Sequence, residues 1–338
     1  MLSGRHEKMT EKEKYIDIVL PWVDGDDPRL RAERFSYMKD GKEASLEDIA
    51  GETRYKNLGE IRYCIASINM FAPFVRKIFI VTDGQDPEIQ NEMQERFPNG
   101  CIPMEIVDHR VIFKGYEQYL PVFNSRAIEA MIWRIPGLSE HFILMNDDFL
   151  LTRPTTEKDF FRDGKTICYA DWFHTKWARF LRWAKPKKKG HKNVGFKDSM
   201  LNALDILGGG PRFLCLGHTP RALKKSFYET FFSEREDVMI RNIRHRFRDA
   251  EQYNSQELFY MYEYMHGRCI AEPLGKKVLY LKPRKKRSYI DDKLKHFRQS
   301  KEAIFCCINA LCIANEADQK KVLNWMDEKI DQNLCDPR

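Results

Sequence analysis

The order of apolar and polar residues predicts three β-strands in the first half of the chain. Residues Tyr15–Leu20 (YIDIVL), Lys77–Thr82 (KIFIVT) and His141–Met145 (HFILM) are short runs rich in β-branched and aromatic side chains. Each run is followed by turn-forming and acidic residues, which are PWVDGDDP at 21–28, DGQDP at 83–87 and NDD at 146–148. The sequence therefore predicts three strands that each end in an acidic loop.

Helical periodicity separates these predicted strands. A helix is expected from Asn57, where Glu60 three residues later completes a capping pair. Its apolar face consists of Leu58, Ile61, Ile65 and Ile68. A second helix is expected to begin near Asn124 and Ser125. Strands that alternate with helices predict a Rossmann-like α/β fold with a mostly parallel sheet, in which ligands bind at the carboxyl ends of the strands. We therefore expect the acidic loops to share one rim of the sheet.

The second half of the chain has a different character. Beyond about residue 155 the sequence is richer in aromatic and basic residues and lacks clear strand-helix alternation, which favours a helical, basic insertion or subdomain. Helices are predicted after Asn254, with Glu257 as its capping partner, and over residues 316–331. The apolar run Ala303–Ala314 is expected to be a buried helix, with contact at a membrane surface as the alternative. We expect four segments: a disordered N-terminus (1–14), an α/β core (15–155), a remainder of the same catalytic unit (156–300) and C-terminal helices (301–338).

Composition narrows the class of protein. The 338 residues are 43% hydrophobic, which is ample for a sizeable core. We find no signal-peptide pattern and no apolar run of the roughly 18 to 20 residues that span a bilayer. The nine cysteines form no paired CxxC elements, which favours reduced thiols over a zinc site or a disulfide framework. A cytoplasmic protein is expected, with peripheral contact at the inner face of the membrane as an option.

The formal net charge of +7 is modest and is concentrated in two runs, KPKKKGHK at 185–192 and KPRKKR at 282–287. Such runs are usually solvated loops, and contact with an anionic membrane, a glycan or nucleic acid is the alternative. Nucleic acid is not an expected partner of the whole protein. The sequence leaves the oligomeric state open.

Four motifs, in order, resemble the Stealth family, which includes bacterial capsular polysaccharide phosphotransferases and the N-acetylglucosamine-1-phosphotransferase that tags lysosomal enzymes. The first is IDIVLPWVDGDDP at 16–28, although Leu20 and Pro21 stand where the family more often has Tyr and Thr. The second runs from RYKNLGEIRY at 54–63 through FAPF at 71–74 and IVTDGQ at 80–85 to FILMNDDF at 142–149. The third is GHTPR at 217–221, and the loosest is RFR at 246–248 with QELFY at 256–260.

The resemblance implies a fold of the nucleotide-sugar-transferase type, called GT-A-like, and an activity. The activity is transfer of a hexose-1-phosphate from a nucleotide diphosphate sugar such as UDP-GlcNAc to a glycan hydroxyl, with release of a nucleoside monophosphate, in capsular or cell-wall polysaccharide synthesis. The α/β core would bind the donor and the remainder would face the acceptor. This reaction requires a cation or arginines to manage phosphate charge and a group that takes the hydroxyl proton.

Acidic residues at the strand ends are candidates for the metal and the donor. Asp147 and Asp148 offer the hard oxygen ligands that Mg²⁺ or Mn²⁺ prefers, although a strand-end pair of this kind is equally compatible with a structural turn. Asn146 is a candidate for orienting the pair or contacting the donor. Asp24 and Asp27 in the first loop are candidates for contact with the nucleotide or for the metal shell, although this loop is also compatible with a simple acidic turn. Trp22 and Gly25 are further candidates for donor binding there, and Asp83, Gly84 and Gln85 have a similar status in the second loop.

The remaining candidates carry a proton or positive charge. His218 is the candidate general base, because an unperturbed imidazole accepts a proton near neutral pH and the resemblance places a catalytic histidine in this region. Arg221 and Arg248 offer planar guanidinium groups to phosphate oxygens, with Arg246 as the fallback for Arg248. Arg54 and Arg62 are the last candidates for substrate binding. They lie near the start of the first predicted helix and would contact the donor.

Two other functions stay open from the sequence. A metal-dependent glycosyltransferase uses the same acidic pair and releases a nucleoside diphosphate instead of a monophosphate. A non-enzymatic protein that binds polyanions through its basic, tryptophan-rich second half would show strongly salt-dependent binding.

Overall fold

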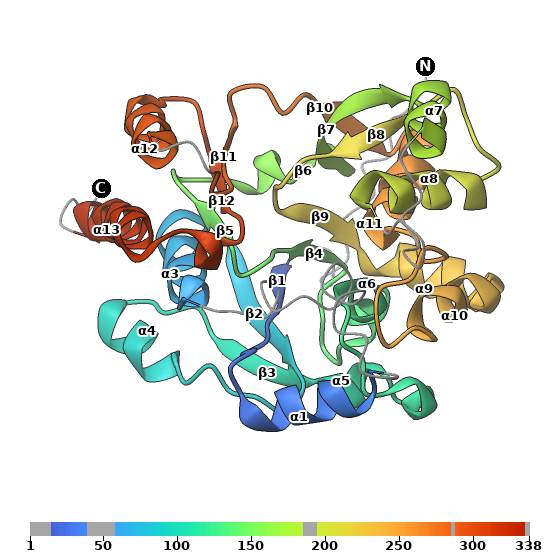
Figure 1. Ribbon diagram of the computed structural model, residues 1–338, viewed down its shortest axis with the longest axis horizontal. Helices are drawn as coiled ribbons and strands as arrows, with labels where there is room; N and C mark the ends of the chain where they lie inside the picture. The colour runs from blue at the N-terminus through green and yellow to red at the C-terminus, as the bar shows by residue number, and fades with distance from the viewer. Residues whose placement is uncertain (1–14, 39–57, 185–194, 285–287, 335–338) are drawn as a thin grey trace, which may run out of the picture.

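The computed structural model describes residues 15–38, 58–184, 195–284 and 288–334, with side chains up to Ile330 (Figure 1). The sequence-based predictions that fall partly or wholly outside the described residues include the disordered N-terminus, the donor candidate Arg54, the capping residue Asn57, the basic run 185–192 and part of the run 282–287. Among the described residues no helix is long and apolar enough to cross a membrane.

A five-stranded sheet with the order β3-β2-β1-β4-β9 forms the centre of the protein. Its strands are β1 (Ile16–Pro21), β2 (Val75–Thr82), β3 (Met104–Asp108), β4 (His141–Leu144) and β9 (Arg221–Lys224). The first four are parallel, with Leu20 beside Ile80 and Val19 beside Leu144, and β9 runs antiparallel to β4. The three predicted strands and the mostly parallel sheet are confirmed.

Both faces of this sheet are buried, which explains the nearly continuous apolar runs of its strands. Ile18 and Leu20 pack in one hydrophobic cluster with α3 (Glu60–Phe71), whereas Val19 and Phe79 pack in a second cluster on the opposite face. The chain passes from β1 to β2 and β3 on one side and then returns to β4 on the other side of β1. This reversal creates a topological switch point between β1 and β4, where ligands of α/β proteins bind.

Short helices connect the strands of the core, and one of them begins where the sequence predicted. The helices are α1 (Pro28–Ser36), α4 (Gln90–Arg96), α5 (His109–Ile112) and α6 (Ser125–Glu129), with 3₁₀ turns η3 (Glu117–Tyr119) and η4 (Ile132–Arg134). Asp27 caps α1, because its side chain accepts a hydrogen bond from the Arg29 amide. Asn124 caps α6 as predicted.

The middle of the chain forms a second sheet and a group of helices. The strands are β6 (Phe161–Arg162), β7 (Lys165–His174), β8 (Arg212–Leu216) and β10 (Cys269–Glu272). The helices are α7 (Thr175–Ala184), α8 (Phe196–Ile206), α9 (Lys225–Glu234), α10 (Glu236–Ile243) and α11 (Ser255–Met265), with the 3₁₀ turn η5 (Glu157–Asp159). Asn254 accepts a hydrogen bond from the Glu257 amide at 2.7 Å, which confirms the predicted start of α11.

A third, three-stranded sheet carries the end of the chain back to the core. Its order is β11-β12-β5, with β11 (Val278–Leu281), β12 (Phe305–Ile308) and β5 (Phe149–Leu151). The prediction of a helix over Ala303–Ala314 is wrong, because this run contains β12 and the 3₁₀ turn η6 (Leu311–Ile313). Phe305–Ile308 is buried on both faces between β11 and β5, so it shows neither helical nor strand periodicity. The helices α12 (Tyr289–Gln299) and α13 (Glu316–Leu334) cover this sheet, and α13 confirms the predicted terminal helix.

A buried ion pair joins three parts of the central sheet at the end opposite the acidic loops. The Asp17 carboxylate on β1 accepts hydrogen bonds from Arg76 Nε at 2.9 Å, from Arg76 Nη2 at 2.6 Å and from the Ser139 amide at 2.8 Å. Asp17 is fully buried, so these hydrogen bonds replace the water that would otherwise solvate its charge.

Replacing Asp17 with Asn is expected to lower the free energy of unfolding by about 2 to 3 kcal/mol, because the amide leaves Arg76 without its charged partner. Urea denaturation measures this change. The matched control is Glu105→Gln, which removes the exposed Lys77–Glu105 pair at 2.8 Å and is expected to cost less than about 1 kcal/mol. Equal losses in the two variants would contradict a structural role for the buried pair.

Candidate functional site

The loops after β1 and β2 are joined through one buried glutamine. Gln85 Oε1 accepts a hydrogen bond from the Asp24 amide, and its Nε2 donates to the Asp24 carbonyl and to Asp27 Oδ2, each at 3.0 Å. The bond from Gln85 is the largest of the effects that lower the pKa of Asp27. Gln85 and Asp27 thus fix the shape of the first loop, in addition to any role with a ligand.

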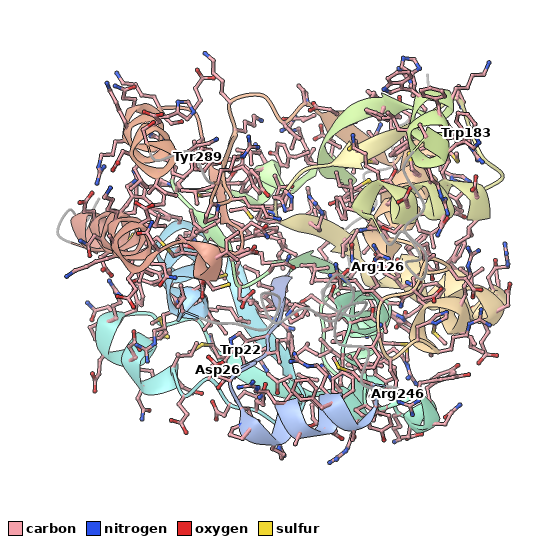
Figure 2. The ribbon with its side chains drawn as sticks, in the orientation of Figure 1. Trp22, Asp26, Arg126, Trp183, Arg246 and Tyr289 are labelled. Atoms are coloured by element: carbon pink, nitrogen blue, oxygen red, sulfur yellow. The ribbon has the colours of Figure 1, made fainter. Side chains whose placement is uncertain are left out.

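The other predicted residues of the first loop differ in exposure. Trp22 and Gly25 are buried, Asp24 is partly buried, and Asp26 is exposed. Trp22 Nε1 is buried and has no hydrogen-bond partner among the described residues. Figure 2 shows Trp22 and Asp26 between β1 and α1, at the carboxyl end of the sheet. The partly buried Asp24 therefore lies in the loop that follows β1, beside the switch point.

The second loop lies beside the end of β3. Gly84 has a φ of +65°, and a Cβ there would come within 3.6 Å of Arg29 Nη2 and of Asp108 Oδ2. Burial raises the pKa of Asp83, and the nearby Asp108 carboxylate raises it further. Asp108, which also ends a strand, was missed by sequence reasoning because β3 was not predicted. Asp147 and Asp148 follow β4 at the same edge of the sheet. We call the residues at the carboxyl ends of these four strands the acidic rim (residues 22–27, 83–85, 108 and 146–148).

The Asp148 carboxylate is held by the third sheet. Its Oδ2 accepts a hydrogen bond from Asn309 Nδ2 at 3.2 Å and contacts Cys307 Sγ at 3.6 Å, and the Asp148 carbonyl accepts from the Ile308 amide at 2.9 Å. Asp148 Oδ1 is buried and has no hydrogen-bond partner among the described residues. One oxygen is therefore fixed by protein groups, while the other has no protein donor.

Three carboxyl groups gather at the end of β4. Burial is the largest cause that raises the pKa of Asp147 to about 8 and that of Asp148 to about 6. The negative charges of Asp148 and of Glu60, on the first turn of α3, raise the pKa of Asp147 further. Asn146 is exposed, and its carbonyl contacts Cys64 Sγ at 3.6 Å. Partly desolvated carboxylates with an oxygen that has no hydrogen-bond partner in the described part of the chain are a donor set suited to a hard divalent cation.

His218 lies in a stack of aromatic rings. Its imidazole is nearly parallel to the Tyr280 ring, with centroids 4.7 Å apart, and faces Phe196 at 6.2 Å. Burial is the largest cause that lowers the pKa of His218 to about 4, and the positive charges of Arg221 and Lys282 lower it further. Burial raises the pKa of Tyr280, and the charges of Cys307 and Asp148 add to this effect. Tyr280 therefore stacks on the predicted base and is also close enough to Asp148 to interact with it electrostatically.

Arg221, at the start of β9, is buried and directed at the loop that carries His218. Its Nη1 donates to Thr219 Oγ1 and its Nη2 donates to the Gly217 carbonyl. Gly217 cannot be replaced without movement, because a Cβ there would lie 2.2 Å from Leu274 Cδ2. In this conformation Arg221 holds the His218 loop.

Arg248 and Arg221 both interact electrostatically with one carboxylate, Glu129 at the end of α6. Arg248 Nη2 donates to Ser125 Oγ at 3.0 Å, and Gln256 Nε2 donates to Glu129 at 3.0 Å. Burial raises the pKa of Glu129, and the hydrogen bond from Gln256 and then the positive charge of Arg248 oppose this rise only in part. Arg221 also interacts electrostatically with Glu129. Sequence reasoning missed Glu129, although it is an acidic residue inside an apolar run (AIEAMIW).

Three predicted residues lie apart from this group or outside the described part of the chain. Arg246 donates to the Leu120 carbonyl at 3.1 Å and lies over the Tyr37 ring, near α1 and α5 (Figure 2). Arg62 is exposed and pairs with Glu92 on α4 at 3.3 Å. Arg54 falls outside the described residues. Of the two arginines weighed for the fourth motif, Arg248 is the one that joins Glu129.

Comparison with solved structures agrees with this architecture. The chain resembles the apo structure of the bifunctional glycosyltransferase WbbM, with a TM-score of 0.51 and 9% sequence identity over 96% of this chain and 52% of that one. At this identity the likeness shows the fold alone. The expected GT-A-like α/β fold is confirmed.

Curated relatives are named phosphotransferases. The exopolysaccharide phosphotransferase SCO6023 of Streptomyces coelicolor is 33% identical over 77% of this chain and 42% of the relative. CpsY of Mycobacterium tuberculosis, also named an exopolysaccharide phosphotransferase, is 32% identical over 79% of this chain and 47% of the relative. The receptor polysaccharide phosphotransferase WefC of Streptococcus oralis is 38% identical over 44% of this chain and 42% of the relative. The chain thus spans less than half the length of these relatives.

Family models match two ranges of the chain. Residues 14–42 match conserved region 1 of Stealth proteins, and residues 54–169 match conserved region 2. These ranges contain the acidic rim, whereas the motifs around His218 and Arg248 lie beyond them. From the two matched regions and the relatives that extend over three quarters of its length, we conclude that the chain belongs to the Stealth family.

Proposed function

We propose that this protein transfers a sugar-1-phosphate from a nucleotide diphosphate sugar, such as UDP-GlcNAc, to a glycan hydroxyl in capsular or cell-wall polysaccharide synthesis. The observation that carries the proposal is the partly desolvated Asp147–Asp148 pair at the switch point, with the Tyr280–His218 stack beside it. The names of the relatives support the choice of phosphotransfer.

Mg²⁺ or Mn²⁺ is the proposed cofactor. Asp148 would bind it through Oδ1, the oxygen without a protein donor, and Asp147 would supply a second carboxylate. When bound, the cation neutralises charge on the donor diphosphate. Asn309 and Cys307 hold the other oxygen of Asp148 and so fix the direction in which Oδ1 points.

His218 is the proposed general base. The acceptor hydroxyl oxygen forms a bond to the sugar-side phosphorus, the phosphoanhydride bond to the nucleotide breaks, and the hydroxyl proton moves to the imidazole. The nucleoside monophosphate leaves with the bonding electrons. The lowered pKa of His218 keeps the imidazole neutral and able to accept a proton. The negative charge of a bound diphosphate would raise this pKa towards neutral pH.

Arg248 and Arg221 have different roles in this proposal. Arg248 would donate to phosphate oxygens, while Arg221 positions the His218 loop and adds positive charge. The first two loops of the acidic rim, with Trp22, Asp24, Gly25, Asp27, Asp83, Gly84 and Gln85, would contact the nucleotide part of the donor. Asn146, exposed beside Asp147, would contact the sugar.

Glycosyl transfer is the second candidate, because the fold is shared with the bifunctional glycosyltransferase WbbM. The two reactions differ in the released nucleotide. Incubating the protein with a panel of nucleotide sugars, Mg²⁺ and a glycan acceptor distinguishes them. A monophosphate supports our proposal, and a diphosphate favours glycosyl transfer.

Asp148→Asn and His218→Ala are each expected to lower the rate of nucleoside monophosphate release by about a hundredfold or more, because one removes a charged metal ligand and the other removes the base. The matched control is Asp26→Asn, whose side chain is exposed on the same rim and whose rate should stay near that of the wild type. Circular dichroism establishes that the variants are folded. Near-full activity in a folded variant would remove that residue from the mechanism.

Binding of Mn²⁺, measured by electron paramagnetic resonance, is expected to weaken about tenfold or more in Asn309→Ala, because Asp148 Oδ2 loses the donor that orients the carboxylate. Asp148→Asn is expected to weaken it further. Wild-type affinity in Asp148→Asn would place the metal elsewhere.

The His218 imidazole is expected to titrate near pH 4 in the free protein when followed by NMR of labelled histidine. Lys282→Met should raise this pKa, because a positive charge that disfavours the imidazolium is removed. A nucleoside diphosphate should raise it as well, because it adds negative charge. No change on adding the nucleotide would show that the diphosphate does not bind beside His218.

A further inference from the structure

Helix α7 is attached to the protein with its apolar side facing outwards. The side chains of Thr175 and Ala178 are buried against the body, whereas Trp177, Phe180 and Trp183 are 54%, 49% and 77% exposed. In most surface helices the apolar stripe faces the core. The orientation of α7 is therefore the reverse of the usual one.

Polar contacts hold α7 in this orientation. Arg179 pairs with Asp205 on α8, and Arg182 lies 3.7 Å from Asp198 and 3.3 Å from Asn202 on the same helix. These arginines occupy the side of α7 that packs on α8. The outward direction of the aromatic side chains is thus fixed by specific interactions.

The outward side chains form one continuous stripe. Trp177 stacks on Phe180 with ring centroids 5.3 Å apart, and Phe180 lies 6.0 Å from Trp183. Leu181, at 37% exposure, widens the stripe. Figure 2 shows Trp183 on α7 at the outer edge of the molecule. Other exposed apolar residues, such as Phe35 and Ile313, lie on separate elements.

The charge around the stripe is positive. Lys176 is exposed on α7, Lys197 lies over the Phe173 ring at 3.9 Å, and Arg212 lies over the Trp172 ring at 4.3 Å. The sequence from Trp172 to Lys197 contains no Asp or Glu, and the acidic residues that face α7 from α8 are those already paired with its arginines. Asp171, the residue before Trp172, is an exposed acid near Lys197, so the face combines aromatic side chains with a net excess of positive charge.

We propose that α7 docks the protein on an anionic lipid surface. The helix would lie in the plane of the interface, with Trp177, Phe180 and Trp183 at the level of the headgroups and the lysines against lipid phosphates. Tryptophan is enriched at membrane interfaces, and a basic amphipathic helix gains both apolar burial and attraction to anionic lipids there. A second copy of the chain suits this face less well, because it would bring α7 of one copy, with the same charge, against α7 of the other.

Vesicle sedimentation tests the proposal with the full chain. Wild-type protein is expected to bind vesicles of phosphatidylcholine mixed with phosphatidylglycerol, to bind phosphatidylcholine alone weakly, and to dissociate as salt is raised. The triple variant Trp177→Ala, Phe180→Ala, Trp183→Ala should bind about tenfold or more weakly. The matched control is Phe35→Ala, an exposed aromatic on α1 that should leave binding unchanged.

Brominated lipids provide a second readout, because they should quench the tryptophan fluorescence of the wild-type protein and quench the triple variant less. The substituted side chains are exposed, so circular dichroism and thermal unfolding should match those of the wild type. Wild-type binding to mixed vesicles by the folded triple variant would overturn the proposal. Failure of the wild-type protein to bind mixed vesicles would also overturn it. If the wild-type protein does not bind vesicles but forms dimers, and the triple variant is monomeric, the stripe would be assigned to self-association instead.

Discussion

The arrangement of this protein depends on keeping two carboxylates, Asp147 and Asp148, close together and partly out of water at the end of β4. Such groups repel each other and lose hydration, so they raise the free energy of the fold unless other groups compensate. The core that buries them comes from distant parts of the chain. Asn309 and Cys307 contribute contacts to Asp148 from the third sheet. Glu60 on α3 adds a further negative charge, which increases the repulsion that the fold must compensate.

Positive charge is concentrated near His218. Arg221 and Lys282 act electrostatically on the imidazole, and Arg221 and Arg248 each interact electrostatically with Glu129, a partly buried carboxylate. The site therefore has a negative part and a positive part, and the ring of Tyr280 stacks on His218 and also interacts with Asp148. A bound cation and a diphosphate are the ligands that would neutralise this separation, since each brings the charge that one part lacks.

The sequence predicts the elements with strong local signals. Strands β1, β2 and β4, the caps at Asn124 and Asn254, and the sharing of one rim by the acidic loops follow from short patterns and from the rules of parallel sheets. The error at Ala303–Ala314 has a physical cause, because a strand buried on both faces loses the alternation that identifies it. The family resemblance identified Asp148, His218 and Arg248 as candidates, and their chemical roles stay predictions.

Contacts between distant residues explain what the sequence did not predict. Tyr280 is one aromatic residue in a short strand, and only the fold places it near both His218 and Asp148. Asn309 gives no sequence signal at all for its bond to Asp148, which lies 161 positions earlier. Glu129 was detectable as an acid in an apolar run, but its two arginine partners come from other segments.

The position of β12 has a consequence for the order in which the site forms during synthesis. A ribosome makes the central sheet, including β9, long before it makes Phe305–Ile308 and Asn309. Until that strand inserts between β5 and β11, Asp148 lacks its side-chain partners from Cys307 and Asn309. Folding from the N-terminus therefore leaves Asp148 without these partners until residue 309 has been made, 161 positions after the carboxylate itself.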